Sequence, residues 1–267
     1  MTIKEYVVKR KRELKEEVSH FSTPIKMVIV QVNDDPASDT YIRGKIRDSE
    51  EVGIQAELIK LPVTTTQLEL STLIKRLNQD SSVHGFIIQM PLPKAIDEEY
   101  IKTLVSPAKD IDGFHPLSKF SPCTPLGIIN YLKEENIVLD GRNAVVIGRS
   151  NIVGKPMARL LMKENMNVTV LHSHTFKDDL QFYVAHADLI VIAIGHKYFL
   201  NHSFSYKKDA VLVDVGINRI DGVTYGDIEP EQNVRLQTPV PGGVGLLTRL
   251  TLLCNLTEAY KNAFFHH

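Results

Sequence analysis

The chain has no tryptophan, only two cysteines and no excess of charge of either sign. Cys123 and Cys254 lie in unrelated contexts, which supports neither a disulfide framework nor a thiolate metal site. With 31 basic and 32 acidic residues, the chain has no net field that would attract nucleic acid or an anionic membrane. The longest apolar run, within ADLIVIAIG, is far shorter than the roughly 20 residues that span a bilayer, and the first residues are polar. We therefore expect a globular cytoplasmic protein that binds neither nucleic acid nor membrane and holds no metal.

The most informative stretch that is present is AVVIGRSNIVGKP, residues 144–156. An apolar strand leads into a turn that contains Gly148 and Gly154, and a helix follows. In such a turn glycine lets the backbone approach a pyrophosphate, and the helix N-terminus supplies N–H groups and partial positive charge. Ser150 and Val153 stand where the usual G-x-G-x-x-G pattern has its second and third glycines. The pattern alone therefore fits either a dinucleotide cradle or a turn that binds nothing.

Three more apolar segments follow, at residues 167–171, 187–195 and 210–216. Strands that alternate with helical or loop segments predict a parallel sheet with right-handed crossovers. In the NAD-binding form of this fold, an acidic residue at the end of the second strand holds the ribose 2′-hydroxyl. Residues 172–175, HSHT, contain no acid, and Arg149 lies within the turn. Both features favour NADP over NAD.

A second alternation of strands and helices precedes this unit. Residues 106–125, rich in proline, aspartate and glycine, mark the domain junction. A last helix over about 246–265 can return to the first domain, and we exclude His266 and His267 as a tag remnant. We therefore expect two α/β domains, one of residues 1–123 completed by 246–267 and one of residues 124–245. The other predicted elements are helices over 2–20, 41–53, 66–78 (with Thr66 as cap) and 126–135, and strands over 26–32, 56–61 and 85–90.

Tyr41 and Lys45 are four residues apart in SDTYIRGK, so a helix places both on one face. A lysine desolvated beside a tyrosine can carry a proton, although the spacing alone favours a solvated lysine and a half-buried tyrosine. Gln89 ends the apolar strand GFIIQ. It fits a ligand-facing residue at a carboxyl strand end and, equally, a polar edge residue with satisfied hydrogen bonds.

Two further groups of titratable residues have alternative interpretations. Asp110 and Asp112 in KDIDGFHP either shape a turn or hold the N–H groups of a ligand, and composition does not choose between them. His172 and His174 have no further metal ligands at suitable spacing, which favours a surface or phosphate-facing role. Asp214, at a strand end, is interpreted as structural.

Seven segments in a fixed order resemble one family: DDPASDTYIRGK, GFIIQMPLP, PAKDIDGFHP, PCTPLGI, GRSNIVGKPMA, ADLIVIAIG and TPVPGGVG. They resemble the bifunctional methylenetetrahydrofolate dehydrogenase/methenyltetrahydrofolate cyclohydrolase enzymes of folate one-carbon metabolism, which serves purine biosynthesis. The resemblance implies an N-terminal α/β domain, completed by the C-terminal helix, that faces a Rossmann-like NADP-binding domain across a cleft. It implies a homodimer formed through the nucleotide domains. It also implies NADP-dependent oxidation of 5,10-methylenetetrahydrofolate to 5,10-methenyltetrahydrofolate, followed by hydrolysis to 10-formyltetrahydrofolate.

The resemblance implies a role for each matching residue. Lys45 corresponds to the catalytic lysine and Gln89 to the residue that orients it. Tyr41 corresponds to the tyrosine that lines the folate pocket, and Asp112 to the carboxylate that holds the pterin. Ser38 lies beside them, and the implied substrate-binding set also includes Pro241, Gly242 and Gly243. The implied cofactor contacts are Gly148, Arg149, Ser150, Ile152, Ser173, His174, Gly195, Ile217 and Gly245, and Gly242 to Gly245 form the loop that closes over nicotinamide and folate.

The chain departs from the family pattern in a few places. It lacks the short leading strand and the glycine-lysine turn, so we expect a trimmed sheet edge. Leu246 and Leu247 replace proline and methionine, which can loosen the substrate end of the cleft, Asn33 replaces a glycine, and His174 replaces a basic residue. Two rival functions remain. One is a dehydrogenase of the same fold for another small substrate, and the other is a catalytically impaired folate- or nucleotide-binding paralogue.

Overall fold

The computed structural model describes residues 1–265; His266 and His267, interpreted above as a tag remnant, lie outside the described residues. The chain divides into two compact units. We call Val8–Cys123 together with the chain from Arg249 onward the lysine unit, and Met1–Val7 together with Thr124–Thr248 the glycine-turn unit. Within residues 1–265, no helix combines the length and the hydropathy that crossing a bilayer requires.

The unit boundaries differ from the predicted domains at both ends of the chain. The first seven residues belong to the glycine-turn unit, and the last helix changes unit after Thr248 instead of Gly245. Contacts of the first residues with Tyr131 explain the N-terminal difference. The Tyr131 hydroxyl donates to the Met1 carbonyl at 3.0 Å, and the rings of Tyr6 and Tyr131 lie 5.5 Å apart.

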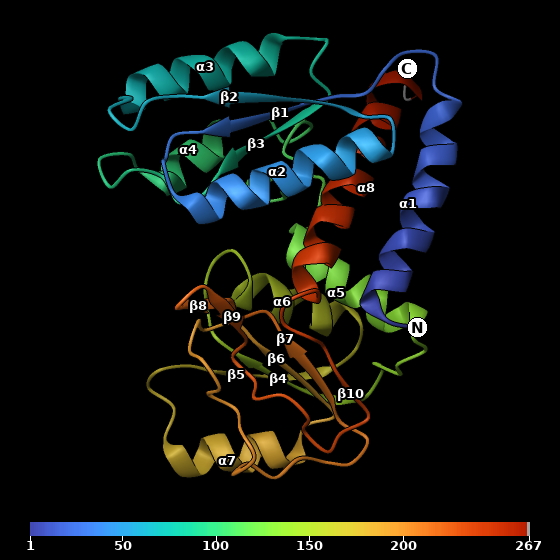
Figure 1. Ribbon diagram of the computed structural model, residues 1–267, viewed down its shortest axis with the longest axis vertical. Helices are drawn as coiled ribbons and strands as arrows, with labels where there is room; N and C mark the ends of the chain where they lie inside the picture. The colour runs from blue at the N-terminus through green and yellow to red at the C-terminus, as the bar shows by residue number, and fades with distance from the viewer. Residues whose placement is uncertain (266–267) are drawn as a thin grey trace. The chain divides into compact units, whose positions relative to one another are not determined.

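The lysine unit contains a parallel three-stranded sheet in the order β2-β1-β3, with helices on both faces (Figure 1). Successive side chains of a strand point to opposite faces. Met27 and Ile29 of β1 accordingly enter one apolar cluster, while Val28 and Val30 enter another on the other face. The strands are β1 (Lys26–Gln31), β2 (Gln55–Lys60) and β3 (Gly85–Gln89). The helices are α2 (Pro36–Glu51), α3 (Gln67–Gln79), α4 (Glu98–Leu104) and the larger parts of α1 (Ile3–Ser19) and α8 (Val244–Phe265).

The C-terminal helix completes this unit, as predicted. Leu252, Leu253 and Leu256 of α8 are fully buried in the same cluster as Met27, Ile29 and residues of α2. Burying an aliphatic side chain of this size contributes about 1.5–3 kcal/mol. The helix is therefore part of the core of the lysine unit, although it lies more than 100 residues away in the chain from the rest of that unit.

The helix starts follow from capping residues. Thr66 caps α3 as predicted, because its hydroxyl accepts from the Glu69 N–H at 3.3 Å while the Glu69 carboxylate accepts from the Thr66 N–H at 2.7 Å. The prediction for α2 was wrong at its start: the helix begins at Pro36 and not at residue 41. Asp35 caps it by accepting from two backbone N–H groups, and proline suits the first helical position.

The glycine-turn unit contains a parallel five-stranded sheet in the order β10-β7-β6-β4-β5, as expected for the second α/β domain. The chain leaves β4 for β5 on one side and later returns to β6 on the other side of β4. Ligands of such sheets bind at the carboxyl ends of the strands where the order reverses. The elements are strands β4 (Asn143–Ile147), β5 (Asn167–Leu171), β6 (Leu189–Ile192), β7 (Val211–Asp214) and β10 (Leu236–Gln237), the hairpin β8 (Asn218–Ile220) and β9 (Val223–Tyr225), and helices α5 (Cys123–Glu134), α6 (Gly154–Lys163) and α7 (Lys177–His186).

Candidate active site and nucleotide cradle

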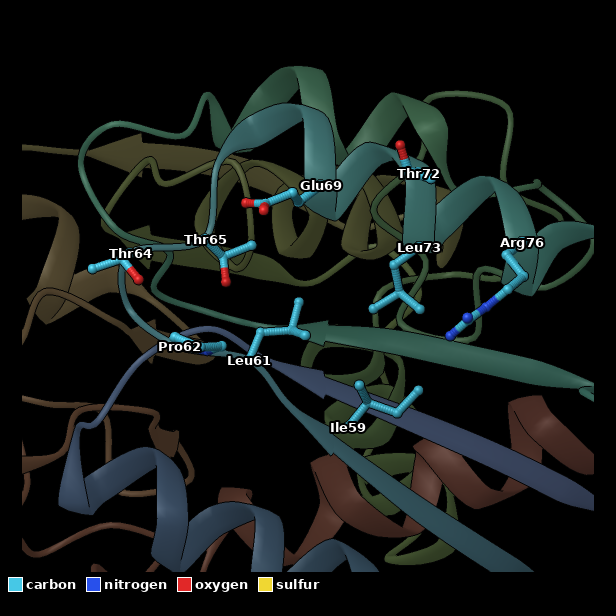
Figure 2. A pocket seen from close by; sticks show the side chains of 9 residues that line it. All are labelled: Ile59, Leu61, Pro62, Thr64, Thr65, Glu69, Thr72, Leu73 and Arg76. Atoms are coloured by element: carbon cyan, nitrogen blue, oxygen red, sulfur yellow. The ribbon is translucent and has the colours of Figure 1, made fainter.

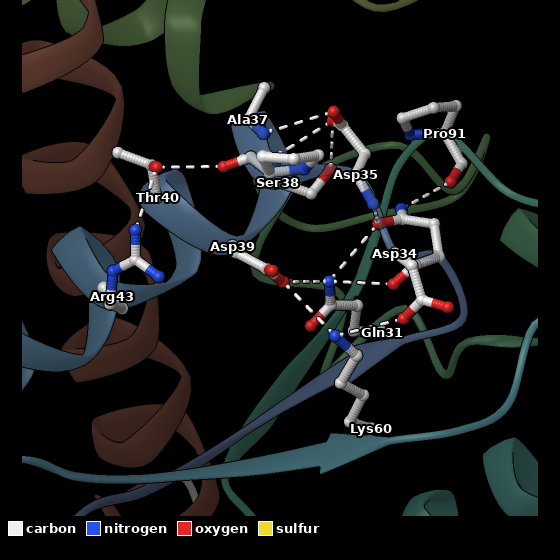
Figure 3. A network of polar contacts seen from close by, with 12 residues as sticks. Gln31, Asp34, Asp35, Ala37, Ser38, Asp39, Thr40, Arg43, Lys60 and Pro91 are labelled. Atoms are coloured by element: carbon white, nitrogen blue, oxygen red, sulfur yellow. Dashed lines mark hydrogen bonds and ion pairs between the residues drawn. The ribbon is translucent and has the colours of Figure 1, made fainter.

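A polar network fixes the start of α2 against the carboxyl ends of the sheet in the lysine unit (Figure 3). Gln31, at the end of β1, is fully buried, and its amide donates to the Asp39 carboxylate at 2.7 Å and to the Asn33 carbonyl at 3.0 Å. The Asn33 side chain donates to the Pro91 carbonyl at 2.7 Å. The loops that follow β1 and β3 are thereby joined. Asn33, a departure from the family pattern, is one of the residues that join them.

Tyr41, Lys45 and Gln89 come together in this unit. Lys45 is buried, with 5% of its surface exposed, and its Nζ donates to Gln89 Oε1 at 3.1 Å. The Gln89 amide nitrogen donates to the Met90 carbonyl at 2.8 Å, which turns Oε1 toward the lysine. Lys45 Nζ also lies 4.9 Å from the centre of the Tyr41 ring, within the range of a cation–π contact. The sequence spacing alone favoured a solvated lysine, and the structure shows a buried one.

The charges around Lys45 adjust its proton affinity. Burial lowers the pKa of Lys45, and the Arg249 guanidinium lowers it further, whereas Asp112 and Cys123 act in the opposite direction. Burial raises the pKa of Asp112 to about 6, against the attraction of Lys45. Desolvation dominates for both groups because it penalises each charged form. A lysine with a lowered pKa exchanges a proton more readily near neutral pH.

Asp110 and Asp112 have different surroundings. Asp110 accepts from the His115 N–H at 2.8 Å and so shapes the turn, while burial raises the pKa of its carboxyl. Asp112 follows Ile111, whose carbonyl accepts from the Asn255 side chain of α8 at 2.9 Å. The backbone beside Asp112 is therefore held from the C-terminal helix. Ser38 is buried, and its hydroxyl donates to Asp35 at 3.0 Å within the cap of α2.

An ionic cluster behind Lys45 has no counterpart in the sequence reasoning. Asp48 is buried and accepts from Lys11 Nζ at 2.9 Å and from Arg249 Nε at 2.6 Å. The Arg249 side chain packs over Gly44, where an added Cβ would lie 3.0 Å from the guanidinium. Gly44 thus leaves room for the cation that lowers the pKa of Lys45. The pair Asp48 and Arg249 is separated by 201 positions, so no local pattern could have identified it.

The glycine turn in the other unit has the close approaches of a phosphate cradle. A Cβ on Gly154 would lie 2.2 Å from the Gly148 carbonyl oxygen, and one on Gly148 would lie 2.6 Å from the Ala193 carbonyl oxygen. Gly148 has a φ of 118°, which disfavours other residues. The Ser150 hydroxyl accepts from the N–H groups of Val153 and Gly154 at 3.1 and 3.3 Å. The backbone therefore brings the start of α6 against the end of β4, where helix N-termini receive anions.

Residues predicted to read the 2′-phosphate lie at neighbouring strand ends. The Gly148 N–H donates to the Leu171 carbonyl at 2.9 Å, which places the turn after β4 beside the turn after β5. Arg149 is exposed on the first turn, and Ser173 and His174 are exposed on the second. The His174 N–H donates to His172 Nδ1 at 3.2 Å, so this pair shapes its own turn. Within residues 1–265, no group of three or more histidine, cysteine or acidic residues is arranged to hold a metal ion.

The other predicted contacts flank the carboxyl ends of β4, β6 and β7. Ile152, Ile194 and Ile217 are exposed apolar side chains at these ends, at 39%, 37% and 59% of their surface. Gly195 has a φ of 66° and is exposed. Ile194 was not predicted, although it lies in the ADLIVIAIG segment. Exposed apolar side chains around a phosphate cradle suit the flat rings of a dinucleotide.

The loop of Pro241, Gly242, Gly243 and Gly245 belongs to the glycine-turn unit. Gly242 has a φ of 89°, and a Cβ on Gly243 would lie 2.1 Å from the Pro239 carbonyl oxygen. Both positions therefore require glycine, whereas a Cβ on Gly245 would meet open space. Leu247, suspected of loosening this region, is fully buried.

A separate open groove of about 420 Å³ lies in the lysine unit between β2 and α3 (Figure 2). Its apolar floor is made by Ile59, Leu61 and Leu73, and Glu69 and Arg76 lie at its margin. Leu73 belongs to the cluster on the α3 face of the sheet, whereas α2 residues pack on the opposite face. The groove therefore contains none of the predicted site residues.

The geometry defines an α/β enzyme with a buried lysine centre in one unit and a dinucleotide cradle in the other. Two family models match this chain. One, described as tetrahydrofolate dehydrogenase/cyclohydrolase catalytic domain, matches residues 1–112, and the other, described as the NAD(P)-binding domain of the same enzymes, matches residues 122–264. The chain belongs to the tetrahydrofolate dehydrogenase/cyclohydrolase family.

Individual relatives are similar over nearly the full length. The bifunctional protein FolD of Exiguobacterium sibiricum is 43% identical over 264 residues, which cover 93% of this chain and 94% of the relative. The crystal structure of FolD from Campylobacter jejuni is 40% identical, with a TM-score of 0.93 and coverage of 97% and 96%. A Trypanosoma brucei enzyme of the same kind, solved with NADP cofactor and inhibitor, is 28% identical, with a TM-score of 0.93 and coverage of 99% and 98%.

Proposed function

We propose that the chain oxidises 5,10-methylenetetrahydrofolate with NADP⁺ and then hydrolyses the 5,10-methenyl product to 10-formyltetrahydrofolate. The observation that carries this proposal is the buried Lys45, whose Nζ is held 3.1 Å from Gln89 Oε1, in a chain that matches both domains of the family. The reactions serve one-carbon metabolism and purine biosynthesis.

The first step needs a bound dinucleotide, and the residues of the glycine-turn unit fit one. When bound, NADP⁺ would supply the acceptor for a hydride from the methylene carbon, and a conjugated methenyl cation would remain. Gly148, Ser150 and the start of α6 would hold the pyrophosphate, because side chains are excluded there and the N–H groups of Val153 and Gly154 gather around the Ser150 hydroxyl. Arg149 binds the 2′-phosphate, since its planar guanidinium matches phosphate geometry. Ser173 and His174 lie beside the same phosphate. The rest of the cofactor contacts Ile152, Gly195, Ile217 and Gly245. The folate contacts Pro241, Gly242 and Gly243.

The second step is a hydrolysis that releases one proton. Water attacks the methenyl carbon, and a base must take a proton from the attacking oxygen. The bond between that carbon and N5 then breaks, N5 receives the second proton of the water, and the formyl group remains on N10. Lys45 acts as this base, and its lowered pKa makes the neutral amine accessible. Gln89 orients the amine through its Oε1. Tyr41 lines the folate pocket with Ser38 beside it. Asp112 holds the N–H groups of the pterin ring, and its negative charge opposes the lowering of the Lys45 pKa.

We further propose that the protein is a homodimer formed through the glycine-turn unit. β5 is the last strand in the order of its sheet, and exposed apolar side chains gather on β5 and α7. They are Val170 of β5, Phe182 and Tyr183 of α7, and Phe176 directly before α7. A monodisperse species of twice the chain mass in light scattering, converted to a monomer by Phe182→Glu, would support this interface.

The two cysteines are free thiols, which suits a cytoplasmic location.

One experiment tests the proposed reactions. The protein is incubated with 5,10-methylenetetrahydrofolate and NADP⁺, and NADPH and the methenyl product are followed together. We expect NADPH to form while the methenyl compound rises and then decays to 10-formyltetrahydrofolate. NADPH formation only with another substrate would indicate a different dehydrogenase of the same fold. Binding of both ligands without turnover would indicate an impaired paralogue.

A further inference from the structure

Two buried carboxylates, Asp214 and Asp227, lie at the carboxyl ends of the strands that carry the predicted cofactor contacts. Their exposed fractions are 2% and 0%. Asp227 accepts from three consecutive backbone N–H groups, those of Ile194, Gly195 and His196, at 2.8, 3.0 and 2.7 Å. It also accepts from the Asn218 side chain at 2.9 Å. One carboxylate therefore holds the whole turn that follows β6.

Asp214 holds Asp227 in turn. The Asp214 carboxylate accepts from the N–H groups of Asp227 and Ile228 at 3.0 and 2.7 Å and from that of Gly216 at 2.9 Å. Within the described chain, no buried side-chain oxygen or nitrogen is left without a partner. The two carboxylates thus form a satisfied network that joins the ends of β6 and β7 to the segment after β9. Satisfied networks of this kind are rigid because each member is costly to unpair.

Two glycines make room for this network. A Cβ on Gly216 would lie 2.1 Å from the Asp227 carboxylate, and a Cβ on Gly226 would lie 2.0 Å from the Asp214 carboxylate. Both distances are well below van der Waals contact. Each glycine therefore faces the carboxylate of the other segment, and any side chain at either position displaces it.

The held turn is the one that meets the glycine turn. A Cβ on Gly148 would lie 2.6 Å from the carbonyl oxygen of Ala193, directly before the residues that Asp227 binds. Asp227 draws three N–H groups inward, which leaves Ile194 and Gly195 exposed on the outer side of the turn. This outer surface lies where the sheet order reverses, between β4 and β6.

We propose that Asp227 is a positioning residue for NADP⁺, which holds the Ile194–His196 turn in the conformation that receives the cofactor, and that Asp214 supports it. The inference rests on the proposed NADP-dependent function and deepens it. Asp227 does not touch the cofactor in this account. It acts through three backbone N–H groups, so its loss raises the cost of organising the turn at the moment of binding.

The test compares Asp227→Asn and Gly216→Ala with wild type. The asparagine keeps the shape but points an amide N–H₂ group at backbone donors, and the alanine displaces the carboxylate without changing any charge. Isothermal titration with NADP⁺ should give a Kd raised at least tenfold in both variants. The KM for NADP⁺ should rise by a similar factor, with kcat at saturating NADP⁺ within threefold of wild type. Hydrolysis of preformed 5,10-methenyltetrahydrofolate, which needs no dinucleotide, should be retained.

Asp221→Asn, at the exposed tip of the β8–β9 hairpin, is the matched control and should bind NADP⁺ as wild type does. NADP⁺ binding within twofold of wild type in both test variants would overturn the inference. A parallel fall of hydrolysis, kcat and melting temperature would also overturn it, because it would show a purely structural role. Failure of the wild-type protein to bind NADP⁺ would instead overturn the proposed function, and that outcome is visible before any variant is made.

Discussion

The two units form their sites from different parts of the residues, one from side chains and the other from backbone. In the lysine unit the site consists of side chains: Lys45, Gln89, Tyr41 and Asp112 contact or influence one another directly. In the glycine-turn unit the site consists mostly of backbone, shaped by glycines and by the carboxylates of Asp214 and Asp227. Proton transfer needs a group with an adjusted pKa, whereas holding a dinucleotide needs backbone N–H groups and room for close approach. Each unit therefore has the kind of group, side chain or backbone, that its part of the reaction requires.

Lys45→Met should separate the activities of the two units most strongly. Removing the base should lower the rate of methenyltetrahydrofolate hydrolysis by about 1,000-fold, within the range for general acid–base catalysis. NADP⁺ affinity should be unchanged because the cradle lies in the other unit. A stopped-flow or steady-state hydrolysis assay and NADP⁺ titration measure the two effects. Arg47→Met, an exposed position on the same helix, should retain full hydrolysis, and an active Lys45→Met protein would refute the assigned role.

Gly154→Ala should produce the converse result. Its Cβ would lie 2.2 Å from the Gly148 carbonyl oxygen, so the turn or the start of α6 must move. We expect kcat/KM for NADP⁺ to fall about 100-fold, equivalent to the upper range of overpacking costs. Hydrolysis of preformed methenyl substrate should persist. Lys163→Ala, exposed at the opposite end of α6, is the control, and normal NADP⁺ kinetics in Gly154→Ala would show that the close approach is not needed.

Arg149→Ala tests cofactor choice within the cradle. A charge-assisted contact to the 2′-phosphate contributes about 1.5–3 kcal/mol, so the ratio of kcat/KM for NADP⁺ over NAD⁺ should fall about 50-fold. The value for NAD⁺ should change little, since NAD⁺ has no 2′-phosphate. Equal kcat/KM for both cofactors in the wild-type enzyme would contradict the assignment outright.

The smallest effect concerns the stability of the carboxylate network and its dependence on pH. Burial raises the pKa of Asp214 from 3.8 to about 6. Between pH 3.8 and about 6, Asp214 is therefore protonated in the folded state and ionised in the unfolded state. The free energy of unfolding falls as the pH rises through this window. Between pH 4.5 and 7.5 the contribution is about 2 kcal/mol. Urea unfolding of wild type and Asp214→Asn should show this pH-dependent difference, and parallel curves for the two proteins would contradict it.

Much of the architecture was predictable because it depends on local patterns. The Thr66 capping box involves residues three positions apart, and Gln89 ends an apolar run whose length predicts a buried strand. Parallel sheets followed from the alternation of strands and helices, and both were confirmed. The helical periodicity predicts the start of α2 too late, because the helix is begun by its cap, Asp35, and by Pro36 and not by its first apolar residues.

The unpredicted contacts behind Lys45 and beside the glycine turn join distant residues. Asp48 meets Arg249 across 201 positions, and Asp227 meets the turn at Ile194 across 33. Neither aspartate stands in a motif. Asp227 follows a glycine in YGDIEP, a context typical of an ordinary turn.

The sequence by itself determined the alternation of strands and helices, the glycine turn and the family resemblance, because these are properties of neighbouring residues. The tertiary structure alone decided that Lys45 is buried and which groups adjust its pKa. It alone decided that the remote carboxylate of Asp227, supported by Asp214, holds the turn beside Gly148. Burial and pKa depend on every charge and every surface packed around a group, and these come from all parts of the chain.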